Sequence, residues 1–157
     1  MADYKQYFRQ YKTNLSLLKL KEIEDTNLFR EINEVKNPSV KAQVITDMPI
    51  THGEENSPVE RFVVAKEKRL EELYAKRSKL QEEMRLIENE IIRCEACLDI
   101  LDNKERYIIE QYYLEGLEWS LVSNAYQCKY QRWISVKQLI IIRNNAIDKI
   151  EKLLKSA

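Results

Sequence analysis

The sequence predicts an all-α protein in which a long, coiled-coil-like antiparallel helical hairpin precedes a C-terminal helix-turn-helix unit. Three observations predict this class. Apolar residues recur at helical spacing through most of the 157 residues. Only two glycines and three prolines interrupt the chain, and all three prolines fall within residues 37–58. The strict alternation of apolar and polar residues that is typical of strands is scarce.

The first predicted element is a helix over residues 1–36, followed by an irregular linker over residues 37–58. The linker contains all the prolines, one of the two glycines and the run GEENSP. At its end, Ser57 and Pro58 suit the N-cap and first turn of a further helix. The helix over 1–36 is predicted from apolar side chains three and four residues apart, namely Tyr4, Phe8, Tyr11, Leu15, Leu18, Phe29, Ile32 and Val35.

A heptad repeat predicts one long helix over residues 59–101. Such a seam must be covered by another helix, and the N-terminal helix, folded back through the linker, is the nearest cover. A self-paired homodimer is the alternative, and Lys66 and Arg77 would set the register of either arrangement. Ten of the twelve seam positions are apolar; the two series are Val63, Leu70, Arg77, Met84, Ile91 and Leu98, and Lys66, Leu73, Leu80, Ile87, Cys94 and Leu101.

Residues 102–157 are expected to form three shorter helices, which together suggest a helix-turn-helix unit. Asp102 and Glu105 have the spacing of a capping box. Gly116 stands where the residue that follows a helix C-terminus is expected. The three helices are predicted over 103–115, over 118–126 and from about Trp133 to Leu154.

The charge of the chain is unevenly distributed. Lys and Arg number 26, as do Asp and Glu, so the net charge is zero. Residues 129–157, however, carry seven basic and two acidic side chains. We therefore expect the partner of the C-terminal end to be nucleic acid. No apolar run approaches the ~20 residues of a membrane span, and MADYKQYFRQYK contains no apolar core of a secretion signal, so we expect a cytoplasmic protein with no membrane partner.

The cysteines and the single histidine argue against metal and catalytic chemistry. Cys94 and Cys97 form half of a zinc motif, but the only further ligands of these types, Cys128 and His52, are far along the chain. We expect reduced thiols on a helix. Because His52 is the only imidazole, no Ser or Cys has a nearby histidine base. The scarcity of glycine also excludes Gly-rich phosphate loops, so we expect neither an enzyme nor a bound metal or cofactor.

The third C-terminal helix carries the most specific pattern. Ser135 is followed at fixed intervals by Leu139, Ile142, Ala146, Ile147 and Ile150. This pattern resembles the recognition helix of bacterial sigma factor region 4, in which a Ser or Thr caps the helix and the apolar residues pack it. The segment from Leu101 to Trp119 is similar to the first helix and turn of the same module.

The layout of the whole chain resembles that of the phage late-gene transcriptional regulators of the RinA and ArpU type. Those small cytoplasmic proteins have an N-terminal helix, a polar linker, a long helix and a terminal sigma-like helix-turn-helix. Residues 142–147 are similar to the corresponding stretch there. The resemblance implies a sequence-specific DNA-binding regulator, expected to be an activator, whose partners are double-stranded DNA, RNA polymerase and a second copy of the chain.

The resemblance places DNA contacts at the exposed N-terminal positions of the recognition helix, since those positions enter the major groove. On an alignment that caps this helix at Ser135, Gln138 would pair with adenine and Lys137 with guanine. Val136 and Ile141 would meet thymine methyl groups, and Ser135 and Arg143 would lie near phosphate. A second candidate is the basic and aromatic cluster Lys129, Tyr130, Arg132 and Trp133, which either clamps phosphate beside the groove or is a loop in which Trp133 is buried.

The alignment has one departure, because the family spacing puts the capping residue near position 129, six residues before Ser135. Either residues 128–133 hold an insertion or the third helix begins earlier. Two other functions also fit the sequence. One is a phage DNA-packaging recognition subunit or another non-transcriptional DNA-binding, oligomerising protein, and the other is a protein-interaction module that binds no DNA. The C-terminal position of the module favours the transcriptional regulator.

Overall fold

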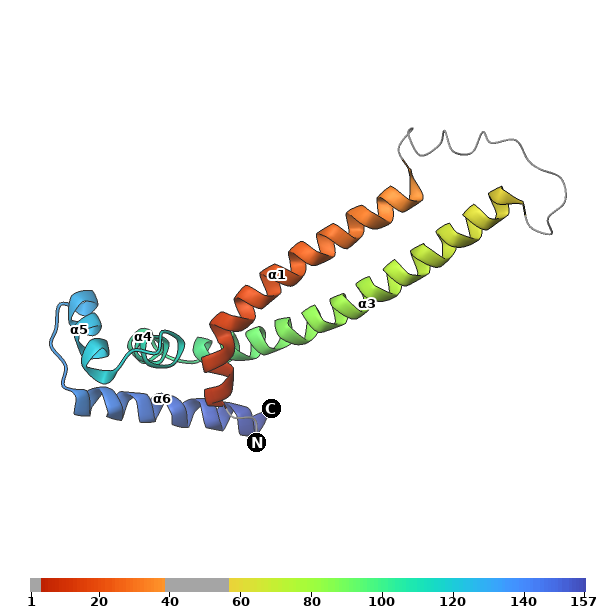
Figure 1. Cartoon of the computed structure of the whole chain (residues 1–157). Coiled ribbons are helices and arrows are strands. Elements are labelled where there is room, and N and C mark those ends of the chain that lie inside the picture. Colours follow the sequence, from red (N-terminus) through yellow and green to blue (C-terminus); the bar gives the residue numbers. More distant parts are fainter. Residues whose placement is uncertain (1–3, 39–56) are drawn as a thin grey trace. The chain divides into compact units, whose positions relative to one another are not determined.

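The computed structural model describes residues 4–38 and 57–157, and every regular element in these ranges is helical (Figure 1). The predicted all-α class is therefore confirmed for the described residues. None of the helices in these ranges is both long enough and apolar enough to cross a membrane. Residues 39–56, which include His52 and most of the predicted linker, lie outside the described residues. The elements are α1 (Tyr4–Lys36), α3 (Pro58–Asp99), α4 (Asn103–Ile109), a π-helix (Glu110–Leu114), α5 (Trp119–Tyr130) and α6 (Val136–Ser156).

The chain divides into two compact units, and α1 and α3 each contribute to both. The described part of one unit comprises residues 18–38 and 57–86. The other comprises residues 4–17 and 87–157 and contains α4, α5 and α6.

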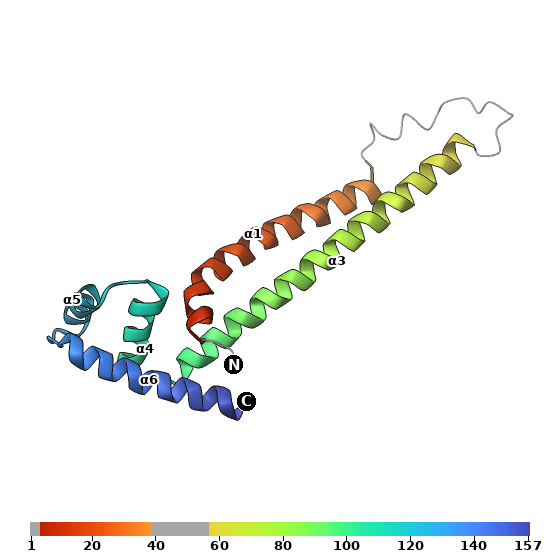
Figure 2. The same ribbon diagram turned by 60° about the horizontal axis from the view of Figure 1, so that its bottom comes forward.

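In the unit of residues 18–38 and 57–86, α1 and α3 lie side by side and contact each other in antiparallel order (Figures 1 and 2). Arg77 donates two hydrogen bonds to the Asp25 carboxylate, at 2.8 and 3.2 Å, and Arg69 forms an ion pair with Glu31. The Arg77 guanidinium lowers the pKa of Asp25 below its usual value, chiefly through this hydrogen bonding. The apolar contacts between the helices are made by Leu28, Ile32, Leu73 and Leu80.

The predicted heptad seam agrees with the burial of α3. Eleven of the twelve seam positions are buried or half-buried, and Val63 is the exposed one. Lys66, one of the two polar seam residues, donates to the backbone carbonyl of Lys36 at 3.1 Å and so satisfies an acceptor at the C-terminus of α1. The helix ends at Asp99, two residues earlier than predicted, because the chain turns before the next helix begins.

The predicted start of α3 is confirmed by its hydrogen bonds. The Ser57 hydroxyl accepts from the backbone N–H of Glu60 at 3.1 Å, and the Glu60 carboxylate accepts from the backbone N–H of Ser57 at 3.2 Å. These two bonds form a capping box, and Pro58 is the first residue of the helix.

The unit of residues 4–17 and 87–157 has a core that joins the start of α1 and the end of α3 to the C-terminal helices. Cys94 and Cys97 are free thiols buried in this core, as expected for packing residues on a helix. Burial raises the pKa of Cys94 to about 12. Within the described ranges, no three His, Cys, Asp or Glu side chains gather as a metal site would require. The core consists of Phe8, Cys94, Cys97, Leu98, Leu101, Ile109, Tyr113, Ala146 and Ile150.

The predicted helix over 103–115 is α4 continued by the π-helix. Its predicted capping box is present, since Glu105 N–H donates to Asp102 at 2.8 Å and Asp102 N–H donates to Glu105 at 3.4 Å. Gly116 has a left-handed φ of 70°, which glycine adopts without strain, and it follows the helical segment as predicted. The wider π-helical turn was not predicted. In it Tyr113 is buried, and Tyr112 packs both against the core just described and against a second core that contains Ile108 and Val122.

The predicted bounds of the last two helices need correction. The predicted second helix over 118–126 is α5, which continues to Tyr130, where Gln131 takes a left-handed φ of 55° and ends it. The predicted start of the third helix at Trp133 is wrong. Ser135 has extended backbone angles, with φ −75° and ψ 153°, so α6 begins only at Val136. The third helix therefore does not begin before Ser135, and residues 128–134 belong to the end of α5 and to the loop that follows it.

Candidate nucleic-acid interface

Helices α4, α5 and α6 are held together by a second core and by hydrogen bonds to backbone carbonyls. The Ser123 hydroxyl donates to the carbonyl of Ile134 at 2.8 Å and fixes α5 to the loop that precedes α6. The Tyr107 hydroxyl donates to the carbonyl of Ala125 at 3.2 Å and fixes α4 to α5. The second core consists of Ile108, Val122, Tyr126, Ile134 and Leu139.

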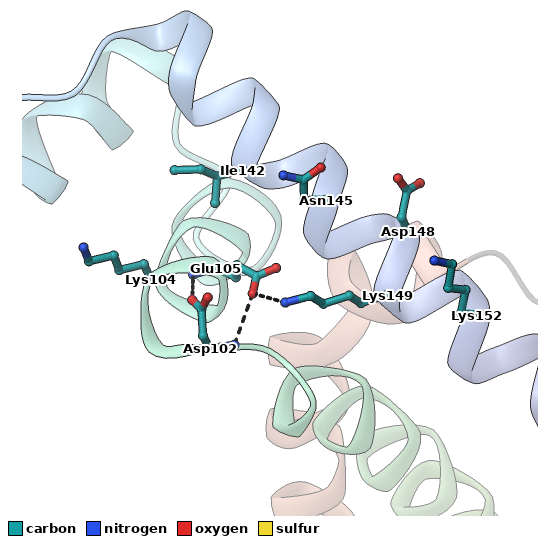
Figure 3. Close-up of a pocket in the computed structure, with 8 residues that line it drawn as sticks. All are labelled: Asp102, Lys104, Glu105, Ile142, Asn145, Asp148, Lys149 and Lys152. Carbon is teal, nitrogen blue, oxygen red and sulfur yellow. Dashed lines mark hydrogen bonds and ion pairs between the residues drawn. The ribbon is translucent and has the colours of Figure 1, made fainter.

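An ion pair between a buried carboxylate and an exposed lysine ties the first turn of α4 to the middle of α6 (Figure 3). The Lys149 ammonium lies 2.5 Å from one oxygen of the buried Glu105 carboxylate, and hydrogen bonding to Glu105 raises the pKa of Lys149. Within the described residues, the second oxygen of Glu105 has no hydrogen-bond partner. Glu105 also belongs to the capping box of α4, so one carboxylate positions both helices.

The N-terminus of α6 is fixed by a capping box. The Ser135 hydroxyl accepts from the backbone N–H of Gln138 at 3.2 Å, and the Gln138 side-chain oxygen accepts from the backbone N–H of Ser135 at 3.5 Å. Ser135 was predicted as the cap, and this is confirmed. The second role of Gln138, as the other half of the box, was not predicted.

Substitution of Ser135 by alanine is expected to lower the free energy of unfolding by about 1 kcal/mol, because the first turn of α6 then loses its side-chain acceptor. Thermal or urea denaturation followed by circular dichroism measures this. Ser135→Asp keeps an acceptor at the N-cap and should retain most of the stability. Equal losses in the two variants would show that the cap does not stabilise α6.

Three predicted base-reading residues share one exposed face of α6. Lys137 and Gln138 lie four and three residues before Ile141, which is the spacing of neighbours on a helix surface, and all three are exposed. Val136 lies about 140° around the helix from Ile141 at ~100° per residue, so the structure does not place it with them. Arg143 is similarly about 160° away from Ile141.

Arg143 contacts an aromatic pair beside α6. The rings of Tyr112 and Trp119 are stacked with centroids 4.1 Å apart. The Arg143 guanidinium lies 5.4 Å from the Trp119 ring centroid and 5.9 Å from that of Tyr112, within range of a cation–π contact. Its nitrogens also donate to the side chain of Asn144. Arg143 is thus held beside the N-terminus of α5.

The predicted basic and aromatic cluster is divided between two places. The Lys129 ammonium lies 4.3 Å from the Tyr107 ring and 5.7 Å from the Tyr130 ring. Arg132 and Trp133 line a different depression. Trp133 is 68% exposed, so the alternative in which it is buried is wrong; Ile134 is the buried residue of this loop.

That depression, here called the Trp133 groove, has a volume of about 530 Å³. Trp133 belongs to the predicted basic and aromatic cluster, whereas Lys104 was not among the predicted site residues. Lys104 belongs to α4 and is brought to the groove by tertiary packing. The groove is lined by Lys104, Tyr126, Arg132, Trp133, Ile134, Gln138, Ile141 and Ile142.

Comparisons of this chain with protein families, with curated proteins and with solved structures find no match. Its function must therefore be inferred from the residues of the C-terminal helices and from their geometry.

Proposed function

We propose that the chain is a sequence-specific DNA-binding transcriptional regulator in which α4, α5 and α6 form a helix-turn-helix unit and α6 is the recognition helix. The observation that carries the proposal is the exposed face of Lys137, Gln138 and Ile141 at the N-terminal end of the 21-residue α6. Recognition helices place their N-terminal residues against base edges. The core and the Ser123 hydrogen bond hold α5 against the loop that leads into this helix.

The chemistry of this face suits the major groove, where each base pair presents a distinct pattern of donors and acceptors. The Lys137 ammonium can donate to guanine, and the Gln138 amide can donate and accept at adenine. Arg132 lines the same depression as Gln138 and adds positive charge beside it, and Lys129 is exposed in the last turn of α5. The net charge of +5 over residues 129–157 favours a polyanionic partner.

The sequence resemblance to sigma region 4-like modules of phage late-gene regulators supports the transcriptional class of this proposal. In a regulator of this class, α1 and α3 would form a long helical hairpin that serves dimerisation or contact with RNA polymerase. The protein would act in the host cytoplasm, without a catalytic step and without a cofactor.

The salt dependence of DNA binding tests the proposal. If about five phosphates are neutralised, a plot of log affinity against log salt concentration should have a slope of roughly −4 to −5. Fluorescence anisotropy with a labelled duplex, chosen by selection from a random library, measures this slope. Affinity that is insensitive to salt would contradict the proposal and favour a protein-interaction module.

Single lysine variants make the salt test specific to the C-terminal unit. Lys129→Ala is expected to reduce the magnitude of the slope by about one, as the loss of one phosphate contact should. Lys76→Ala removes an exposed lysine from α3 and should leave the slope unchanged. If Lys76→Ala changed the slope as much as Lys129→Ala, the DNA contacts would not be those of the helix-turn-helix.

A further inference from the structure

The Trp133 groove exposes apolar surface directly beside the face of α6 that we assign to DNA. Trp133 is 68% exposed and Ile141 is 51% exposed, and both line the groove. Gln138, a proposed base-reading residue, lines it as well. The groove is thus continuous with the proposed reading face, and its apolar side chains have water on one side.

The charges around the groove indicate what its partner carries. Lys104 and Arg132 line it, and within the described residues its lining includes no carboxylate. The groove therefore suits a partner that combines negative charge with a small apolar surface. The major groove of DNA has this combination, since phosphates flank it and the thymine C5-methyl is the apolar group on its base edges.

We propose that the Trp133 groove makes the protein specific for thymine at a position next to the base read by Gln138. In this arrangement Ile141 and Trp133 contact the C5-methyl group, and Lys104 and Arg132 face the flanking phosphates. The sequence placed Val136 beside Ile141 as the second methyl contact. Because Val136 lies on another face of α6, Trp133 takes its place. This inference rests on the proposed DNA-binding function.

Deoxyuridine tests the inference, because it pairs as thymine does and lacks only the methyl group. A preferred duplex is first selected from a random library with the full-length protein. Each thymine in it is then replaced in turn by deoxyuridine, and affinity is measured by fluorescence anisotropy. We expect one or two positions at which binding weakens about fourfold, which corresponds to the ~0.8 kcal/mol of one buried carbon.

Protein variants connect that effect to the groove. In Ile141→Ala or Trp133→Ala, deoxyuridine at the sensitive position should have little further effect, because the methyl contact is already lost. Ile92→Ala is the matched control, since Ile92 is a similarly exposed isoleucine on α3 and does not line the groove. This control should keep the fourfold effect. Circular dichroism verifies that each variant is folded.

A fluorescence measurement keeps the inference testable even if the alanine variants do not fold. The chain has two tryptophans, Trp119 and Trp133. Trp119→Phe retains an aromatic ring against Tyr112 and leaves Trp133 as the only tryptophan. Its emission should shift to shorter wavelength when the selected duplex displaces water from the ring. Unchanged emission would overturn the role of Trp133.

The remaining outcomes separate the inference from the proposed function. If the protein binds its selected duplex but no deoxyuridine replacement weakens binding, the thymine inference is overturned and DNA binding stands. The thymine inference is also overturned, and DNA binding also stands, if Trp133→Ala and Ile141→Ala bind the duplex as tightly as the unchanged protein. That result would point to a protein partner for the groove. If selection yields no preferred duplex, the proposed function itself fails.

Discussion

Replacement of Phe8 by alanine is expected to lower the free energy of unfolding by about 3–5 kcal/mol. Phe8 is 1% exposed, and its ring centroid lies 5.8 Å from that of Tyr113. It packs into the core shared by α3, α4 and α6, so alanine would leave a cavity that closely packed neighbours fill only in part. Urea denaturation followed by circular dichroism measures the loss.

The matched control is Leu20→Ala on the same helix. Leu20 is 64% exposed, so its truncation should change the free energy of unfolding by no more than about 0.5 kcal/mol. Similar losses from both substitutions would contradict the placement of Phe8 in the core. A small loss from Phe8→Ala alone would show that the start of α1 does not stabilise the C-terminal helices.

Replacement of Lys137 and Gln138 by alanine is expected to remove most of the sequence preference in DNA binding. Each lost base contact should weaken specific binding by about 1–3 kcal/mol and leave binding to unrelated duplexes much less affected. Competition between the selected duplex and a scrambled one, followed by fluorescence anisotropy, measures the preference. An unchanged preference in the double variant would move the reading surface to residues 129–133.

Two control variants distinguish loss of base reading from other effects. Gln138→Ala also removes the 3.5 Å bond to Ser135, so Ser135→Ala, which weakens the same cap and keeps both reading side chains, should retain the sequence preference. Arg143→Ala should weaken binding to specific and unrelated duplexes about equally if Arg143 contacts phosphate, because such a contact positions the protein without reading sequence. A change of preference in Arg143→Ala would instead make it a reading residue.

Local signals predicted those parts of the fold that depend on neighbouring residues. The heptad spacing identified the buried side of α3, and Ser57, Asp102 and Ser135 were correctly predicted as helix caps, since each cap is a contact over three residues. The start of α6 was predicted too early, since Trp133 and Ile134 precede the N-cap Ser135 and the helix begins only at Val136. The left-handed backbone of Gln131 ends α5 and leaves both residues in the loop.

The parts that were not predicted depend on tertiary packing. The π-helix places Tyr112 against two cores at once, and no local spacing specifies this. Lys104 reaches the Trp133 groove only because α4 packs beside α6. In the candidate site, the helical period is enough to predict that Arg143 and Ile141 lie on different faces of α6. The contact of Arg143 with the Tyr112 and Trp119 rings could not be predicted, because it depends on how the helices pack.

The hydrogen-bonded pair of Arg77 and Asp25 has a mechanical consequence for α1 and α3. If one helix slid along the other by one heptad, Arg77 would lie opposite Leu18 or Ile32 in place of Asp25. A half-buried guanidinium beside an apolar side chain would lose its partner, which disfavours both of these shifted pairings. A force applied along one helix would therefore meet resistance to sliding between residues 18–38 and residues 57–86.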